Sequence, residues 1–186
     1  MEKIKQIKIS IAFLLILSIN KAFPQKNNKC DFYFEKGNIS INVGPSKLSN
    51  ERILLAIDSY TKAIICDKKF WQAYRNRGKL LILLKKYKLA LDDFNKAIKI
   101  VGQNSYPDLL LKRSTILYEL GEYQRALIDL NQAISLMGNP SYAYLLKAKV
   151  NWKLGKNDEA CRDLKKALKD NPQYIDEVRF IKCATQ

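Results

Sequence analysis

The chain has 186 residues, with 33 Lys or Arg against 18 Asp or Glu and a formal net charge of +15 at pH 7. It contains no His, which excludes Ser-His-Asp and Cys-His nucleophilic sites, His-ligated zinc and imidazole acid–base chemistry. Hydrophobic residues make up 47% of the sequence, which is typical of a folded chain. We therefore expect a non-catalytic protein without a cofactor or a metal.

The first residues have the pattern of a secretory signal peptide. Three lysines precede an apolar run from Ile9 to Ile19, and the small residue Ala22 follows it. This run is well short of the roughly 20 apolar residues that span a bilayer. The pattern predicts a signal peptide over 1–22, a short linker over 23–29, and a soluble mature protein exported to the periplasm or the extracellular medium. The mature chain would keep a net charge of +12.

An internal repeat organises the rest of the chain. Segments 55–65, 89–99, 125–135 and 159–169 align without gaps. They place alanines in two columns, Ala56, Ala90, Ala126 and Ala160 in the first, and Ala63, Ala97, Ala133 and Ala167 in the second. Apolar residues in these segments follow the i, i+3, i+7 spacing of one helical face. Small residues in register let a second helix approach closely.

A second apolar helix is predicted upstream of three of these segments, over 73–84, 109–120 and 143–154. A turn of about three residues, which contains Gly121 or Gly155 in two cases, separates the two helices of each pair. So short a turn predicts an antiparallel helical hairpin.

The hairpins resemble the tetratricopeptide repeat family. The resemblance is clearest over 71–98, where Gly78, Ala90, Phe94 and Ala97 occupy the signature columns of the family. It implies an all-α fold, an α-solenoid of about four repeats within a domain over 30–186. The repeats are expected over 30–70, 71–106, 107–140 and 141–174, with a capping helix over 174–183.

The sequence departs from the family pattern in several columns. Ser114 stands where Gly or Ala is usual, and Arg77, Arg113 and Lys147 each replace a common Leu. Repeat one has seven surplus residues, which we assign to the turn-like segment 44–50, where Ser49 or Asn50 is a candidate N-cap for the next helix.

Four cysteines allow three disulfide pairings. In an antiparallel hairpin the start of one helix lies beside the end of the other, which favours Cys30 with Cys66. By the same register Cys161 lies beside Cys183 of the terminal helix. A metal site is disfavoured because the chain has no C-x-x-C and no His.

In the family, the first helices of the repeats line a concave surface that receives a peptide or an extended segment. Carried over residue by residue, the resemblance implies a partner-binding set of Asn38, Arg75, Asn76, Lys79, Lys112, Tyr118, Tyr142, Lys149 and Trp152. Cations bind carboxylates and aromatic residues supply interface hot spots, so we expect an acidic partner protein or peptide. The implied function is that of an interaction module or adaptor.

Two alternatives stay open at this point. Tyr118, Tyr142 and Trp152 are as compatible with an inter-helix core as with a binding groove. The basic charge also suits a polyanion such as acidic polysaccharide, lipid head groups or nucleic acid, although export argues against nucleic acid. Polyanion binding weakens steeply with salt, whereas groove binding depends more on an aromatic anchor.

Overall fold

The computed structural model describes residues 28–43, 48–138, 140–179, 181 and 183. Within these ranges it contains eight α-helices, one 3-10 helix and no strand, in agreement with the all-α fold expected from the sequence. The predicted signal peptide over 1–22 lies outside the described residues, as do residues 23–27 of the predicted linker and residues 44–47 of the surplus segment. Among the helices in the described ranges, none is long and apolar enough to span a membrane.

The N-terminal unit, up to Asp67, is a single helical hairpin of α2 (Asn28–Ile41) and α3 (Asn50–Cys66). Ser49 caps α3, because its hydroxyl accepts a hydrogen bond from the backbone N–H of Arg52 at 3.4 Å. The start of α2 is bonded to the end of α3 by the disulfide Cys30–Cys66, with the two Cα atoms 5.4 Å apart. This is the pairing that the hairpin register predicts.

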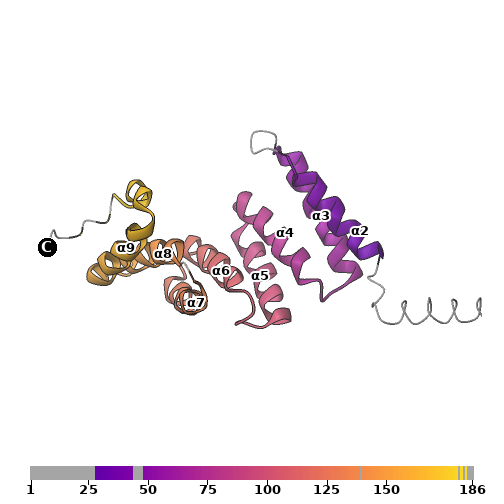
Figure 1. Ribbon diagram of the computed structural model, residues 1–186. Helices are drawn as coiled ribbons and strands as arrows, with labels where there is room; N and C mark the ends of the chain where they lie inside the picture. The colour runs from indigo at the N-terminus through magenta and orange to yellow at the C-terminus, as the bar shows by residue number, and fades with distance from the viewer. Residues whose placement is uncertain (1–27, 44–47, 139, 180, 182, 184–186) are drawn as a thin grey trace, which may run out of the picture. The chain divides into compact units, whose positions relative to one another are not determined.

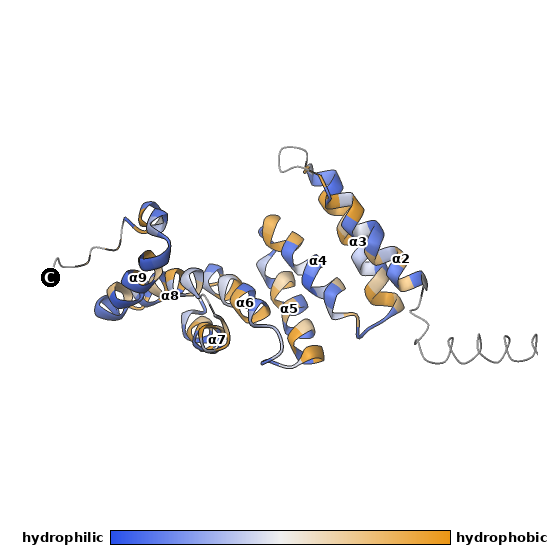
Figure 2. Cartoon of the chain, viewed as in Figure 1, coloured by the Kyte–Doolittle hydropathy of each residue, from blue (hydrophilic) through white to orange (hydrophobic). Residues whose placement is uncertain are grey.

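The second unit, from Lys68 onward, contains three successive hairpins (Figure 1). They pair α4 (Trp71–Leu83) with α5 (Tyr87–Val101), α6 (Pro107–Glu119) with α7 (Tyr123–Leu136), and α8 (Ser141–Lys153) with α9 (Asn157–Asp170). Figure 2 shows hydrophilic and hydrophobic residues side by side along these helices, as amphipathic helices require. Each hairpin packs on the next through its second helix, α5 on α6 and α7 on α8.

The turn inside each of these hairpins contains one residue with a left-handed backbone. Gly121 and Gly155 have φ angles of 77° and 73°, and Lys85 occupies the equivalent place with a φ of 55°. Glycine reaches this conformation without strain, whereas the Cβ of lysine opposes it. The chain therefore uses the favoured residue in two of the three turns.

All eight alanines of the two repeat columns are fully buried, with 0% of each exposed. A larger side chain at any of them would separate two helices, because packed interiors tolerate little extra volume. The regular spacing of these alanines in the sequence therefore reflects a regular helix crossing in the structure.

A further column of the repeat shows paired substitutions where two helices contact each other closely. A Cβ added to Gly37 would lie 2.6 Å from the ring of Tyr60, and one added to Gly78 would lie 2.8 Å from the ring of Phe94. In the next two repeats the glycine is replaced by Ser114 and Ala148. The aromatic residue is replaced by Leu130 and Leu164, respectively. A smaller partner thus accompanies each larger residue, which explains why Ser114 fits.

The C-terminal segment differs from the expected capping helix over 174–183. The structure has a 3-10 helix, η2 (Pro172–Val178), and the described residues after it are not helical. Val178 and Ile181 insert into a core cluster with residues of α8 and α9, and Cys183 is bonded to Cys161 of α9 with a Cα–Cα distance of 5.6 Å.

Candidate functional site

The described residues present two polar surfaces with unusual electrostatics, both in the second unit. The first, which we call the cationic cluster, consists of Arg75 and Lys79 of α4 with Asp108 and Lys112 of α6. Arg75 and Lys79 lie one turn apart on α4, as Asp108 and Lys112 do on α6. An ion pair of 3.3 Å between the Arg75 guanidinium and the Asp108 carboxylate joins the two helices.

Lys79 lies where its own positive charge is disfavoured. Partial burial lowers the pKa of Lys79 below its ordinary 10.5, and the neighbouring charges of Arg75 and Lys112 lower it further, while Asp108 opposes them. One carboxylate therefore faces three cations, two of which repel Lys79. An added anion would relieve this repulsion.

Arg75 carries an unused donor in the same cluster. Its Nε atom is buried and has no hydrogen-bond partner, a feature that no other side-chain atom in the described ranges shares. The ion pair with Asp108 is made through the terminal nitrogen Nη2. Arginine binds carboxylates through two parallel N–H groups, so this guanidinium retains capacity for a second acceptor.

The other residues of the predicted partner-binding set lie in several places. Asn76 and Lys149 are half-buried on α4 and α8. Asn38 belongs to the N-terminal unit, where its side-chain oxygen accepts a hydrogen bond of 2.8 Å from the Tyr60 hydroxyl. That bond gives Asn38 a role inside the first hairpin.

The three predicted aromatic anchors each contact other parts of the second unit. Tyr118 lies against Tyr123 of α7 with ring centroids 5.8 Å apart, and Tyr142, which is exposed, lies 6.5 Å from the ring of Tyr174. Trp152 is half-buried against the core cluster formed by α8, α9 and the C-terminal segment. These contacts favour the core interpretation for Trp152 and leave Tyr142 as the most accessible of the three.

Sequence reasoning missed a series of buried ion pairs that recurs from repeat to repeat. Arg77 bonds to both carboxylate oxygens of Asp93 at 2.8 and 2.6 Å, and Arg113 does the same with Asp129 at 2.7 Å for each bond. Arg113 also donates a 3.0 Å bond to Asn95 of the preceding hairpin. The departures from Leu in this column are therefore structural, and the constant spacing of 16 residues between Arg and Asp was the available signal.

The third pair of this series is looser. Lys147 stands in the Arg column, and its Nζ atom lies 3.9 Å from Asp163. In the same hairpin Asn151 replaces the buried Leu81 and Leu117 of the earlier repeats, and its amide donates a 2.9 Å bond to Asp163. Burial raises the pKa of the Asp163 carboxyl, against the opposing effects of Lys147 and Asn151.

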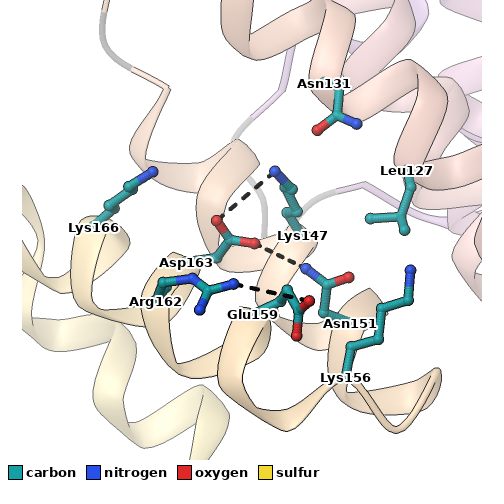
Figure 3. Close-up of a pocket in the computed structure, with 9 residues that line it drawn as sticks. All are labelled: Leu127, Asn131, Lys147, Asn151, Lys156, Glu159, Arg162, Asp163 and Lys166. Atoms are coloured by element: carbon teal, nitrogen blue, oxygen red, sulfur yellow. Dashed lines mark hydrogen bonds and ion pairs between the residues drawn. The ribbon is translucent and has the colours of Figure 1, made fainter.

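Beside this pair lies the second polar surface, a pocket of about 320 Å³. Figure 3 shows its residues around a common space between α7 and the hairpin of α8 and α9. The lining is Leu127, Asn131, Lys147, Asn151, Lys156, Glu159, Arg162, Asp163 and Lys166. Four of these side chains are cationic and two are carboxylates, so the pocket has an excess of positive charge.

Comparison with known proteins places the fold. Residues 72–101 and 141–174 match the family model described as Tetratricopeptide repeat, whereas no curated protein matches the chain. Among solved structures, MamA from Desulfovibrio magneticus RS-1 is 16% identical, with 83% of this chain and 82% of that chain covered and a TM-score of 0.73. YrrB, described as a TPR protein with an unusual peptide-binding site, is 24% identical over 84% of this chain and 76% of its own, with a TM-score of 0.68.

A third structure is the first TPR of Spaghetti (RPAP3) bound to the HSP90 peptide SRMEEVD. It is 24% identical and covers 70% of this chain and 96% of its own, with a TM-score of 0.61. These likenesses show the fold, and the two matched repeats agree with the alanine columns and the packed hairpins of the second unit. The chain contains tetratricopeptide repeats at residues 72–101 and 141–174.

Proposed function

We propose that the chain is a non-catalytic interaction module that binds an acidic peptide or extended protein segment at the cationic cluster of α4 and α6. The observation that carries the proposal is the buried Nε atom of Arg75, which has no hydrogen-bond partner and lies in a cluster with Lys79 and Lys112. In support, burial first and then the charges of Arg75 and Lys112 lower the pKa of Lys79. Perturbed titrating groups are enriched at functional sites, and here the disfavoured charge is the one that an acidic ligand would stabilise.

The chemistry of the cluster suits a carboxylate better than a neutral group. Lys79 and Lys112 offer ammonium donors, and Arg75 retains the unpaired Nε donor. Hydrogen bonds between charged partners are roughly twice as strong as neutral ones, and they strengthen further where water is partly excluded. The proposed flanking contacts are Asn76 on α4 and, on α8, Lys149 and the exposed ring of Tyr142.

Relatives of the same fold support a peptide as the ligand. YrrB is described as having a peptide-binding site, and the RPAP3 domain is bound to a peptide that carries two Glu and one Asp. The proposal does not carry over the HSP90 peptide itself, because Asp108 stands in the cluster where a further cation would be needed for a fully acidic tail.

Fluorescence anisotropy with labelled peptides tests this function. A peptide rich in Glu and Asp should bind, and the same peptide with Gln and Asn should not. Lys79→Gln should weaken binding about tenfold by removing a charge-assisted contact, while stability stays equal or rises because repulsion from Arg75 and Lys112 is relieved. Lys96→Gln, at an exposed lysine of α5, is the matched control and should bind like the wild type.

The same assay separates the cluster from general attraction of polyanions. If heparin and the acidic peptide bind equally, and Lys79→Gln and Lys96→Gln weaken both to the same extent, the net charge of +15 accounts for binding and the cluster does not. If Lys79→Gln weakens binding of the peptide but not of heparin, and Lys96→Gln weakens neither, the result supports the proposed site.

We further propose that the protein works in an oxidising, extracytoplasmic compartment after removal of residues 1–22. Its support is the signal-peptide pattern together with two disulfides, which form and persist in such compartments. Mass spectrometry of the protein from its native host should find a chain that begins near Phe23 and has no free thiol. An intact Met1 on a chain with reduced cysteines would contradict the proposal.

A further inference from the structure

The pocket between α7 and the hairpin of α8 and α9 shares no residue with the cationic cluster. We propose that it is a separate binding site for a carboxylate group, carried either by a small organic acid or by the carboxyl end of a peptide. Its volume of about 320 Å³ lies at the small end of the range for ligand pockets, enough for a carboxylate and a few further atoms.

The pocket exists because two residues differ from their equivalents one repeat earlier. At the junction of the second and third repeats, Arg113 reaches both Asp129 and Asn95, and its guanidinium bridges the two hairpins. At the next junction the equivalent residues are Lys147, Asp163 and Asn131. The single ammonium of lysine lies 3.9 Å from Asp163 and makes no bond to Asn131, so the space that the guanidinium fills at one junction is open at the other.

The second change makes the wall of this space polar. Asn151 replaces a leucine that is buried in both earlier repeats, and it is itself only 3% exposed. Burying an amide in place of an apolar side chain costs stability unless its hydrogen bonds are made. The Nδ2 atom of Asn151 donates a hydrogen bond to Asp163. Both departures therefore make the same junction more open and more polar.

The donors that remain define the class of ligand. Asp163 is engaged by Lys147 and Asn151, and Glu159 lies 3.8 Å from Arg162. Within the described ranges, the side chains of Lys156 and Asn131 have no hydrogen-bond or ion-pair partner in the protein. In Figure 3 the ammonium groups of Lys147 and Lys156 and the amide of Asn131 surround the same space. Two ammonium groups and an amide are the donors that a carboxylate accepts from.

A singly charged ligand fits the two wall carboxylates better than a doubly charged one. Asp163 and Glu159 line the pocket together with the cations, and like charges in a partly buried site repel strongly. The two carboxylates would repel a phosphate dianion about twice as strongly as a singly charged ligand. Leu127 supplies an apolar wall against which a short aliphatic group of the ligand can pack.

Chemical-shift titration of the ¹⁵N-labelled protein tests the site with three probes. Acetate represents a free small acid, N-acetylglycine represents a peptide carboxyl end, and N-acetylglycinamide is the uncharged analogue of the latter. Saturable shifts for residues of α7, α8 and α9 are expected with at least one carboxylate and none with the amide. Acetate alone would identify a small acid as the source of the group, and tighter binding of N-acetylglycine would identify a peptide end.

Three variants make the test specific. Lys147→Arg keeps the charge and restores the residue that fills the equivalent space at Arg113, so it should abolish binding while the protein stays folded. Lys156→Gln removes a free ammonium and should weaken binding about tenfold. Lys165→Gln removes an exposed cation that does not line the pocket, and it should bind like the wild type.

Two results would overturn the proposal. Equal affinity of the wild type and Lys147→Arg would show that the shifts arise from general attraction to a basic surface. The absence of saturable shifts with either carboxylate, in a wild type that is folded by circular dichroism, would show that the pocket is not a carboxylate site. Neither result bears on the cationic cluster, which is tested with different residues and a different ligand.

Discussion

Replacing Asp129 with Ala would test whether the repeated ion pairs stabilise the packed hairpins. Asp129 lies on α7 with only 4% of its side chain exposed, and both of its carboxylate oxygens accept from Arg113 at 2.7 Å. Removal of the carboxylate leaves the Arg113 side chain, which is 15% exposed, with its hydrogen bond to Asn95. The variant therefore buries a positive charge without its counter-charge.

The expected loss follows from this geometry. Breaking a buried ion pair by removing one partner costs about 3–5 kcal/mol. The Asn95 bond and the residual exposure of Arg113 place this case near the lower end, at about 3 kcal/mol. For a chain of this length such a loss corresponds to a fall in melting temperature of roughly 6–12 °C. Asp92→Ala, at an exposed carboxylate, should change stability by no more than about 0.5 kcal/mol.

A double variant separates the cost of an unpaired charge from the net contribution of the pair. With Leu at both positions no charge is buried, and stability should return to within about 1 kcal/mol of the wild type. Urea unfolding followed by circular dichroism measures all four proteins. A loss below about 1 kcal/mol for Asp129→Ala would refute the reasoning, since it would mean that Arg113 readily reaches water. An equal loss in the double variant would instead show that the pair itself is strongly stabilising.

Three further predictions concern single positions. Gly78→Ala should cost about 1–3 kcal/mol, because the new Cβ lies 2.8 Å from the buried ring of Phe94, and adding Phe94→Leu should recover part of the loss in a double-mutant cycle. Lys85→Gly should raise stability by about 1 kcal/mol in urea unfolding, since the φ of 55° disfavours a side chain, and Gly121→Lys should lower it by a similar amount. Burial raises the pKa of Asp163 above its ordinary 3.8. On acidification the folded protein therefore binds this proton at a higher pH than the unfolded chain does. The carboxyl contributes more to stability when it is protonated than when it is charged. The stability of the wild type relative to Asp163→Asn should therefore increase as the pH falls from about 7 to about 4, and a decrease would contradict the sign of the shift.

The parts of the fold that depend on spacing alone are predictable from the sequence. Two columns of alanine at a nearly constant period specify where helices cross, and short turns specify antiparallel neighbours. The pairing of Cys30 with Cys66 then follows from the ends of one hairpin. The cations of the cluster are likewise predictable, because Arg75 and Lys79 lie on one face of α4 and Lys112 occupies the same face of the next first helix.

The ion pairs and the pocket are not predictable in this way. An Arg and an Asp that are 16 residues apart lie on different helices, and whether they meet depends on the rotation of both helices about their axes. Considered singly, Arg113 and Asp129 are of residue types that are usually exposed. The partial burial of Trp152 was not predictable for a related reason. Its surroundings are set by the path of the segment after η2, which depends on Cys183 and not on a helical period.

Equivalent positions in successive repeats distinguish changes that preserve packing from changes that do not. The larger Ser114 is accompanied by the smaller Leu130, so the contact between the two helices is kept. Lys147 has no such compensation, because the residues that Arg113 bridges one repeat earlier are present again as Asp163 and Asn131, but the bridge is absent. Selection for stability alone readily restores such contacts, since stabilising substitutions are common and easily found. Departures that stay uncompensated are expected at functional sites, and the open junction at Lys147 is of this kind.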